Sequence, residues 1–559
     1  MTIHSTVLPV IVEIVARSVP EASALYVVVR LSMPAGQSAE AAFDLLRLID
    51  DPRPLYKLAA KVGFVALRNA TKAALAESLE QAVSTAKTKE LPTFIPAVKP
   101  GWIGDAYVTP QRVYGDPDGW VRPLFTDVPL SLNGFSRGSI RYWRVVVGEK
   151  LTGNPLLIFY VCAALMAPLL KVMGWKEGCG FLLVGDTRGG KTTVAHLGGS
   201  VYGGGDNSRP QLVQSLRVAR NGLEPDAPFA NDRAFFLDDA QDLPGNDGDK
   251  AIVLRDMIHM LHRGRGKGRM GYGQPAEWQC VFFMAHNQTL RQTMSDGRQR
   301  HNKAAEVRLP EIPCDRRYGV FDDIHQENSA SDFADDLRRR ADMFHGAPMD
   351  VFLAEVTKRV AIDREGLKKW LQRHIDSMRR QHLDLSDADY AVGKFFCLAY
   401  AAGRFAEEYC NILPMSANEI RDAVVDVYRS HRRHVGALPK SVDPIDTLKQ
   451  YVQKNLGSFA DQRGELKKAP VRDDAVGYLT NESDRKEFTF TREQFSRAVA
   501  PHLVAHVCPE LKRAGLLIHD GRHSPEEVRG GPVREWNQTK RVTGGKRRFH
   551  YCVSAQILD

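Results

Sequence analysis

One octapeptide near residue 190 has the residue types and the spacing that phosphate binding requires. It comprises Gly185, Asp186, Thr187, Arg188, Gly189, Gly190, Lys191 and Thr192, in the form G-x-x-x-x-G-K-[ST]. An apolar run, 181–184, precedes it, and a run compatible with a helix begins at Thr193. In this order a strand delivers a loop whose backbone N–H groups cradle phosphates, while the lysine reaches the β- and γ-phosphates and the threonine hydroxyl meets Mg²⁺. We therefore predict that residues 185–193 bind ATP and Mg²⁺, with a plain glycine-rich surface turn as the alternative.

Two carboxylates, Asp238 and Asp239, come directly after a second apolar run, 234–237. A strand of a parallel sheet places its last residues beside the phosphates at the carboxyl edge of the sheet. Asp238 is therefore predicted to hold Mg²⁺ together with Thr192, and Asp239 to act as the general base toward the attacking water. The alternative is a strand end that carries two solvated acids.

Asn287 ends a third apolar run, which begins at Val281. A polar side chain there can orient the attacking water, and a helix-capping asparagine is the alternative. Arg308 is the first candidate for an arginine finger, a residue that reaches the γ-phosphate held by a neighbouring subunit. Arg298 and Arg300 are the second candidates, and for each of the three an ordinary surface arginine is the alternative.

Cations gather on glycine-rich backbone at two places, 262–273 and 534–550. The second has Gly544 and Gly545 at its centre, which is typical of a hairpin. Cations on a conformable main chain suit contact with a nucleic-acid backbone, and solvated surface turns are the alternative. The predicted nucleic-acid contacts are Arg263, Arg265, Lys267, Arg269, Lys546, Arg547 and Arg548.

The elements that must position these residues alternate in type. Strands are predicted at 181–184, 233–238, 279–285 and 305–309, with helices between them, and this alternation favours a parallel sheet flanked by helices. Ahead of this core, residues 7–32 carry two strand-like runs, and 36–88 are expected to be helical. After it, residues 331–436 have a helical pattern, and helices are predicted at 494–505 and 508–514.

Five domains follow from these patterns. We predict an α+β N-terminal domain (1–90), a small β-rich module (91–136), a P-loop core (137–330), a helical region (331–440) and a basic C-terminal domain (441–559). In the β-rich module, Trp102, Tyr107, Tyr114 and Trp120 are expected to be buried.

Composition limits the class of protein. The chain has 559 residues, a net charge of +9 and a pI of about 9.0, which fits an anionic partner without identifying one. Its eight cysteines form no C-x-x-C pair, so buried free thiols in a reducing compartment are expected. The longest apolar run, 155–170, is short for a membrane span and contains Pro168. We expect a buried helix there, no signal peptide and a cytoplasmic protein.

Several strings occur together in the order of a known family. They are Gly101 to Pro110, the P-loop, Arg220 to Glu224, Asn231-Asp232, the carboxylate strand, Ala402-Gly403 and Ala514 to Leu517. Over roughly residues 95–559 the chain resembles the domain-of-unknown-function family nine-two-seven of phage, plasmid and integrative-element proteins. Some of its members are similar to the MCM-like, self-loading replicative helicases of staphylococcal cassette elements. The resemblance implies an AAA+ core, a helical lid, a winged-helix-like C-terminal domain and a hexameric ring that works on single-stranded or forked DNA.

The chain departs from the family at two places. Asp239 stands where a glutamate is usual, and 285–288 differ from the usual end of the sensor strand. A shorter carboxylate implies slow hydrolysis or a role for Glu224. The resulting expectation is an ATP-hydrolysing motor on DNA, a mobile-element replicative helicase or a helicase loader. Two alternatives stay open: a nucleic-acid-sensing ATPase switch in phage defence or regulation, without unwinding, and a replication initiator with a decayed ATPase.

Overall fold

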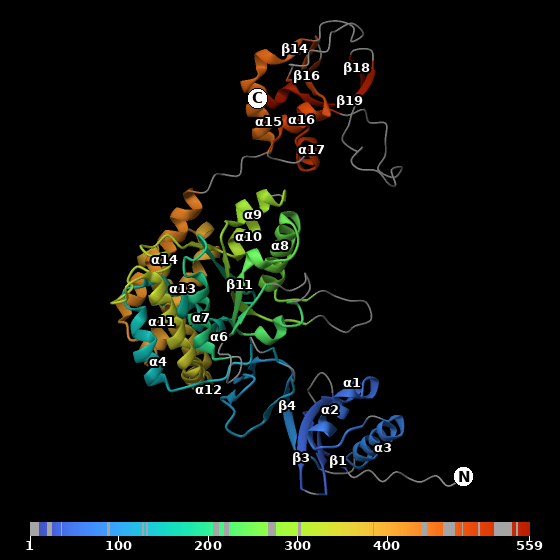
Figure 1. Cartoon of the computed structure of the whole chain (residues 1–559), viewed down its shortest axis with the longest axis vertical. Coiled ribbons are helices and arrows are strands. Elements are labelled where there is room, and N and C mark those ends of the chain that lie inside the picture. Colours follow the sequence, from blue (N-terminus) through green and yellow to red (C-terminus); the bar gives the residue numbers. More distant parts are fainter. Residues whose placement is uncertain are drawn as a thin grey trace, which may run out of the picture. The chain divides into compact units, whose positions relative to one another are not determined.

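The computed structural model describes most of the chain between residues 10 and 558. The segments outside the description are 1–9, 20–24, 35, 67, 87–89, 126–127, 130–131, 205–211, 217–222, 267–275, 300–302, 384, 438–443, 462–475, 483–484, 501–503, 519–538, 544–545 and 559. The chain divides into two compact units (Figure 1). The first holds residues up to 244 together with 253–287 and 304–434; the second holds 245–252, 288–303 and 435–559.

A five-stranded parallel sheet is the centre of the first unit. Its order is β10 (Val213–Gln214), β11 (Arg233–Asp239), β12 (Cys280–His286), β9 (Cys179–Val184) and β13 (Glu311–Pro313). The predicted strands at 181–184, 233–238 and 279–285 are confirmed. Because β12 lies between β9 and β11, its last residues come next to the ends of both neighbours.

The predicted strand at 305–309 is wrong. Residues Lys303–Arg308 form helix α10, and the strand β13 begins only at Glu311. The run Ala304-Ala305-Glu306 has high helix propensity, whereas Pro310 and Pro313 confine the strand to three residues.

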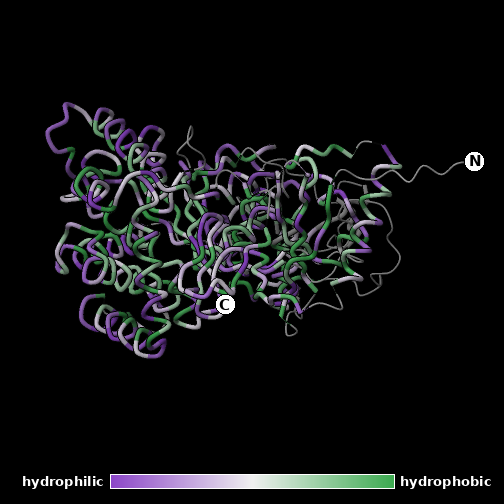
Figure 2. The backbone as a smooth tube through the Cα atoms, turned by 90° about the horizontal axis from the view of Figure 1, so that it is seen from below, coloured by the Kyte–Doolittle hydropathy of each residue, from purple (hydrophilic) through white to green (hydrophobic). Residues whose placement is uncertain are grey.

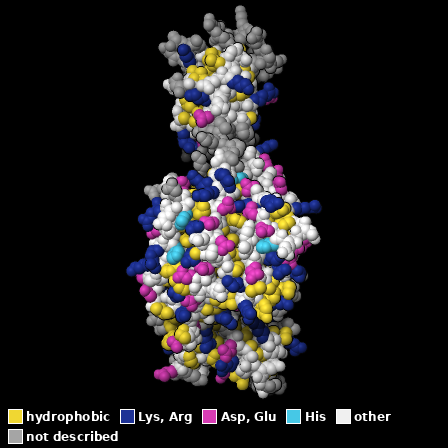
Figure 3. All heavy atoms as spheres, turned by 90° about the vertical axis from the view of Figure 1, so that its left-hand side faces the viewer, with side chains coloured by type: hydrophobic (Ala, Val, Ile, Leu, Met, Phe, Trp, Pro, Cys, Tyr) yellow, Lys and Arg dark blue, Asp and Glu magenta, His cyan; other side chains and the backbone are white. Residues whose placement is uncertain are grey.

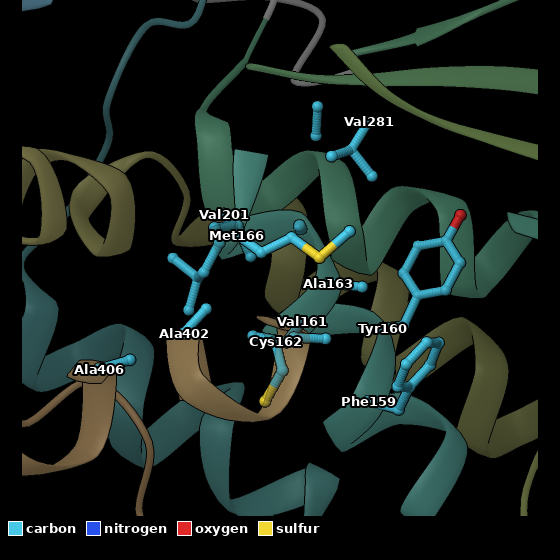
Figure 4. Close-up of a cluster of buried hydrophobic side chains, with 14 of the residues drawn as sticks. Phe159, Tyr160, Val161, Cys162, Ala163, Met166, Val201, Val281, Ala402 and Ala406 are labelled. Atoms are coloured by element: carbon cyan, nitrogen blue, oxygen red, sulfur yellow. The ribbon is translucent and has the colours of Figure 1, made fainter. Parts of the chain in front are cut away.

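An apolar helix supports one face of this sheet. Helix α5 (Pro155–Leu165) is buried over residues 156–165, and α6 (Ala167–Val172) continues it, so the expected buried helix is confirmed. Apolar side chains all around a helix require partners on every side. Figure 4 shows Phe159, Tyr160 and Cys162 of α5 among side chains from α7 (Lys191–Tyr202), β12 and α13 (Asp387–Glu408).

The family string Ala402-Gly403 belongs to this packing. A Cβ at Gly403 would lie 2.5 Å from the Cys162 sulfur. Only glycine therefore allows α13 to approach α5 this closely.

A second, mixed sheet, with both antiparallel and parallel strand pairs, forms the N-terminal part of this unit. Its order is β3 (Ser38–Asp44), β2 (Tyr26–Ser32), β1 (Ile11–Ser18), β4 (Thr93–Ala97) and β8 (Val121–Pro123). Helices α1 (Leu45–Asp50), α2 (Arg53–Lys61) and α3 (Asn69–Ala86) accompany it. The expected helix from residue 36 is wrong over 38–44, where an alanine-rich segment pairs with β2 as a strand. Backbone pairing with a neighbouring strand here outweighs the high intrinsic helix propensity of the alanine and glutamate residues.

A small three-stranded sheet, β5 (Gly101–Ile103), β6 (Ala106–Val108) and β7 (Val113–Tyr114), lies between β4 and β8 in sequence. Trp102, Tyr107 and Tyr114 are buried, as expected, but Trp120 is 52% exposed. Strands β4 and β8 pair in the N-terminal sheet, so this sheet extends past residue 90.

Long helices make up the rest of the first unit, as predicted for 331–436. These helices are α11 (Ala330–Met343), α12 (Ala347–Ser377), α13 and α14 (Ala417–Ala437). A shorter helix, α4 (Ile140–Val146), precedes α5 in the chain. In Figure 2 the tube changes repeatedly between purple and green along the helices, as expected where one face of a helix is buried.

The C-terminal part of the second unit combines helices with a mixed sheet. Its helices are α15 (Pro444–Lys454), α16 (Arg492–Ala498) and α17 (Val504–Arg513), and its sheet contains β14 (Ala460–Asp461), β15 (Tyr478–Glu482), β16 (Arg485–Phe490), β17 (Leu517–Ile518), β18 (Thr539–Thr543) and β19 (Lys546–Ser554). The two predicted helices are present but begin and end earlier than 494–505 and 508–514. The basic segment forms an antiparallel hairpin, β18–β19, in which Thr543 pairs with Lys546.

Charge and hydropathy on the surface are mixed. On the face seen in Figure 3, Lys and Arg side chains alternate with Asp and Glu over the described part of the chain. Among the described residues, no helix combines the length and the apolar character that crossing a bilayer would require.

Candidate nucleotide-binding site

The predicted phosphate loop connects β9 to helix α7 at the carboxyl edge of the central sheet. All six residues of β9 are buried, and α7 begins at Lys191. Gly190 has φ of 89°, and a Cβ there would lie 2.6 Å from a Val320 methyl group. A Cβ at Gly185 would lie 2.7 Å from the Cβ of Cys314. Close packing therefore requires glycine at both positions, and at Gly190 the positive φ requires it as well.

The ammonium group of Lys191 is enclosed by this loop. Its Nζ donates hydrogen bonds to the backbone oxygens of Gly185 at 2.7 Å and Asp186 at 2.8 Å, and to Asn287 Oδ1 at 3.0 Å. The residue is only 6% exposed. Since an ammonium group has three protons, these three acceptors satisfy it completely, and a phosphate would have to replace at least one of them.

Asn287 joins the end of β12 to the loop. Besides accepting from Lys191, its side-chain nitrogen donates to Thr187 Oγ1 at 2.7 Å. The helix that follows, α9 (Leu290–Asp296), is capped by Thr289 through a capping box with Gln292, so capping does not explain Asn287. Its side chain instead faces the loop, which is the placement that a water- or phosphate-orienting residue needs.

Asp238 and Asp239 end β11, on the far side of β12 from the loop. The charge of Asp238 acts on His196, whose pKa burial lowers and which lies one turn beyond Thr192 on α7. Asp239 Oδ1 accepts a hydrogen bond from the Gln241 backbone N–H at 3.0 Å. A shift in the pairing register between Phe236 and Asp239 precedes this contact. The two neighbouring carboxylates thus differ in their surroundings.

The residues present fit a magnesium ion held with the help of phosphate. The Thr192 hydroxyl and the Asp238 carboxylate are hard oxygen donors of the kind Mg²⁺ prefers. Over the described ranges, no group of three or more His, Cys, Asp or Glu side chains could hold a metal ion by itself. Magnesium at this edge would therefore depend on oxygens from the nucleotide and water.

A segment that the sequence analysis missed lies against the phosphate loop. Residues 314–321 follow β13, and the Val320 N–H donates to the Gly189 oxygen at 3.0 Å. In this segment Arg316 is nearly buried, and its Nη1 pairs with Asp426 of α14 and, at 3.5 Å, with Asp322. Burial raises the pKa of the nearby Cys314 thiol to about 12, against the charges of Lys191 and Arg316. No sequence motif marks Arg316, because its position depends on how the segment folds back onto the loop.

The arginine-finger candidates have different settings. Arg308 ends α10, and its Nη1 donates to the Ala304 oxygen at 3.0 Å. Burial lowers the pKa of His259, and the neighbouring charges of Arg308 and Arg263 lower it further, so Arg308 lies near the end of α8 (Asp247–Arg263). Arg298 has a positive φ of 51°, and Arg300 lies outside the described residues. A finger acts on a second subunit, so its assignment remains a prediction.

The predicted basic hairpin begins at the opposite edge of the sheet. The Gly178 N–H, just before β9, donates to the His262 oxygen at 3.2 Å, which places the end of α8 at the amino edge. Gly264 and Gly266 then form backbone hydrogen bonds with Trp278 and Ala276, the base of an antiparallel hairpin.

The structure describes only some of the predicted nucleic-acid contacts on this hairpin and on the C-terminal hairpin. Arg263 and Arg265 are exposed, and the Arg265 guanidinium lies 3.8 Å from the Glu277 carboxylate. Lys267 and Arg269 lie outside the described residues, and for Lys546, Arg547 and Arg548 only the backbone of β19 is described. The suggested role of Glu224 beside the nucleotide is not supported, because its carboxylate lies 3.0 Å from where a Cβ of Gly266 would be, at this amino edge.

Two strings that carried the family resemblance meet in space. Asp232 accepts a hydrogen bond at Oδ2 from the Trp102 N–H at 3.0 Å, and its backbone oxygen accepts one from the Tyr107 hydroxyl at 2.7 Å. Asn231 donates to the Pro100 oxygen at 2.8 Å. A Cβ at Gly101 would lie 2.4 Å from both acid and amide side chains. These strings therefore dock the small β5–β7 sheet onto the amino end of β11.

The strand–loop–helix at β9 and α7, with the carboxylate strand two positions away in a parallel sheet, defines an α/β fold of the P-loop type. Residues 36–272 match the family model "Domain of unknown function (DUF927)", which confirms the resemblance over this part of the chain. The match begins earlier than the expected residue 95 and ends at 272. Among curated proteins no significant match was found.

A solved structure shares the fold over nearly the whole chain. It is described as "SCCmec type IV Cch - active helicase", with a TM-score of 0.58 and 17% sequence identity. The alignment covers 98% of this chain and 94% of that one. At this identity the similarity concerns the fold.

Proposed function

We propose that this protein is an ATP-hydrolysing AAA+ motor that acts on DNA, as a mobile-element replicative helicase or helicase loader. The observation that carries the proposal is the contact of Lys191 with Asn287. It joins a phosphate-binding lysine to the polar end of a neighbouring strand, and the carboxylates of Asp238 and Asp239 end the next strand. The similarity in fold to a mobile-element helicase supports the same conclusion.

In this proposal each residue has one task. Residues 185–193 hold the phosphates of ATP, Thr192 and Asp238 hold Mg²⁺, and Asp239 takes a proton from the attacking water. When bound, Mg²⁺ would supply charge stabilisation to the phosphates. An arginine from a neighbouring subunit of a ring, with Arg308 the first candidate, completes the site. The hairpin that begins at Arg263 and the β18–β19 hairpin contact DNA.

Two assays on one pair of proteins test the proposal. The wild type should hydrolyse ATP and unwind forked DNA, and Lys191→Ala should do neither, because it lacks the charge that neutralises the β- and γ-phosphates. ATP hydrolysis by Lys191→Ala at the wild-type rate would show that the nucleotide site is elsewhere.

A second candidate function is an ATPase switch that senses nucleic acid without unwinding it. The observation that favours it is the hydrogen bond between Asp239 and the Gln241 N–H, which occupies one oxygen of an already short general base. Slow hydrolysis would suit a switch better than a motor. ATP-dependent assembly on DNA, together with an absence of unwinding at any enzyme concentration, would select this function.

A further inference from the structure

A recess opens where the small β5–β7 sheet, the end of α7 and the start of β11 meet α12. It measures about 430 Å³ counted out to solvent. Its lining includes Val108, Gln111, Asn133, Tyr202, Arg233 and Asp350. It lies at the amino edge of the central sheet, since Arg233 is the first residue of β11, whereas the phosphate loop is at the carboxyl edge.

The unusual feature of this recess is the guanidinium of Arg233. The residue is 5% exposed, and burial lowers its pKa, although arginine remains charged in proteins. Its Nη1 donates to the Leu132 oxygen at 2.6 Å, and its Cζ lies 5.0 Å from the ring centre of Tyr202. Within the described ranges it has no ion pair, and its Nε has no hydrogen-bond partner. A buried charge without a counter-charge is costly, so its retention requires a compensating group.

The one carboxylate in the lining does not supply that compensation. Asp350 accepts hydrogen bonds from the Tyr114 hydroxyl and, at 2.7 Å, from Ser136 Oγ. Each of its oxygens therefore already has a donor, and its distance from Arg233 exceeds that of an ion pair. The Tyr107 and Tyr202 hydroxyls donate to the backbone oxygens of Asp232 and Ala164. Arg233 is thus the cation among the lining residues, which also include Gln111 and Asn133; the Gln111 amide donates to Asn133 Oδ1 at 2.6 Å.

We propose that this recess binds a small oxyanion, a carboxylate or a phosphate, against the guanidinium of Arg233. A guanidinium presents paired N–H donors that match both kinds of group. The lining also includes the apolar residues Val108, Met349 and Leu353. This site is separate from the nucleotide site and does not depend on the proposed function.

The test uses the full-length Lys191→Ala protein, so that phosphate binding at the P-loop does not contribute. Its melting temperature is measured in sodium phosphate and in sodium butyrate, each against sodium chloride of equal ionic strength. At ten times Kd either oxyanion should raise Tm by about 1–3 °C. A larger shift with butyrate assigns a carboxylate ligand, and a larger shift with phosphate assigns a phosphate.

Two further variants in the same background identify the group responsible. Arg233→Met should abolish the shift. Arg112→Met removes an exposed arginine just outside the lining and should retain it. An unchanged shift in Arg233→Met, or no shift with either anion in the parent protein, would overturn the proposal.

Crystals soaked in selenate give a measurement that does not depend on the stability of Arg233→Met. Selenate replaces phosphate and is located by its anomalous signal. A peak within hydrogen-bond distance of the Arg233 guanidinium is the expected result. Selenate found only at surface lysines, with none in the recess, contradicts the site.

Discussion

Lys191 Nζ donates to Asn287 Oδ1 at 3.0 Å, so the first residue of α7 is tied to the residue that follows β12. The same amide donates to Thr187, in the exposed part of the phosphate loop. When a phosphate takes the lysine, Asn287 loses one partner and can turn toward the nucleotide. This pair therefore connects occupancy of the loop to the end of a neighbouring strand.

Replacement of Asn287 tests that connection. Asn287→Ala should lower kcat for ATP about 100-fold, the usual effect of losing one well-placed polar group near developing charge. Binding of ATP should change less, because the loop backbone and Lys191 remain. The measurement is steady-state kinetics beside a direct ATP titration; Gln288→Ala, the next residue, is the matched control. Equal losses in binding and in turnover would limit Asn287 to holding the loop.

Substitutions of Asp239 distinguish a role as general base from a purely structural role at the end of β11. Asp239→Asn keeps an oxygen for the Gln241 N–H but cannot take a proton, so ATP should bind without turnover. Asp239→Glu extends the carboxylate by one methylene and should increase the rate. Single-turnover hydrolysis distinguishes the variants. If Asp239→Asn turns over as fast as the wild type, another group is the base.

Gly101 tests the docking of the β5–β7 sheet. An added methyl at Gly101 would lie 2.4 Å from Asn231 and Asp232, and φ is +108°. Gly101→Ala should therefore cost more than about 2 kcal/mol. Gly104 is the control, because φ is +60° with nothing within 4 Å, and Gly104→Ala should cost about 1 kcal/mol from backbone strain alone. Thermal unfolding with limited proteolysis would report both; similar losses would show that the contact with β11 contributes little.

Asp232 predicts a dependence of stability on pH. Burial raises the pKa of this carboxyl above its ordinary value, although the Trp102 N–H partly opposes the rise. Because the pKa is raised in the folded state, Asp232 contributes fully to folding stability below its ordinary pKa, about 4. This stability is lost as the pH rises through the pKa of the folded state. Asp232→Asn removes the titration and keeps an oxygen for Trp102. The difference in Tm between variant and wild type should thus shift in favour of the variant from pH 4 upward; a difference independent of pH would contradict the raised pKa.

The two basic hairpins should have separable effects on DNA. Neutralising Lys546, Arg547 and Arg548 should weaken binding and reduce the slope of log affinity against log salt by roughly one unit for each lost phosphate contact. Neutralising Arg263 and Arg265 should reduce DNA-stimulated hydrolysis more than it reduces duplex binding. Affinities measured across a salt series decide this, since unchanged slopes in both variants would mean that neither hairpin binds DNA.

Motif-bearing and uniformly apolar segments were predictable from the sequence. Strands β9, β11 and β12 contain continuous apolar runs, which are followed by polar residues at the ends of β11 and β12, and α5 is apolar on every side, so local pattern and final position agree. The placement of Asn287 next to Lys191 could be expected from adjacent parallel strands alone.

Positions that depend on distant partners could not be predicted. The alanine-rich segment 38–44 becomes a strand only because β2 pairs with it. Arg316 lies near the phosphate loop because residues far apart in sequence, Gly189 and Asp426, hold its segment. Arg233 looks like an ordinary strand residue in the sequence. Its enclosure depends on Leu132 and on Tyr202 of α7, which are both distant from it in sequence. Such features follow from packing between segments, which local periodicity does not encode.

The eight cysteines are spread through the first and second units. All are free, seven are buried and Cys314 is partly so, which agrees with the expected buried thiols. Burial also raises the pKa of Cys162 and Cys410 to about 12, which suppresses the reactive thiolate. Cys179, Cys280 and Cys314 lie in the central sheet region, Cys162, Cys397 and Cys410 among the helices, and Cys508 and Cys552 in the second unit. Alkylation at the seven buried positions can then occur only when that part opens, so labelling read peptide by peptide would time the local openings of three regions in the unmodified chain.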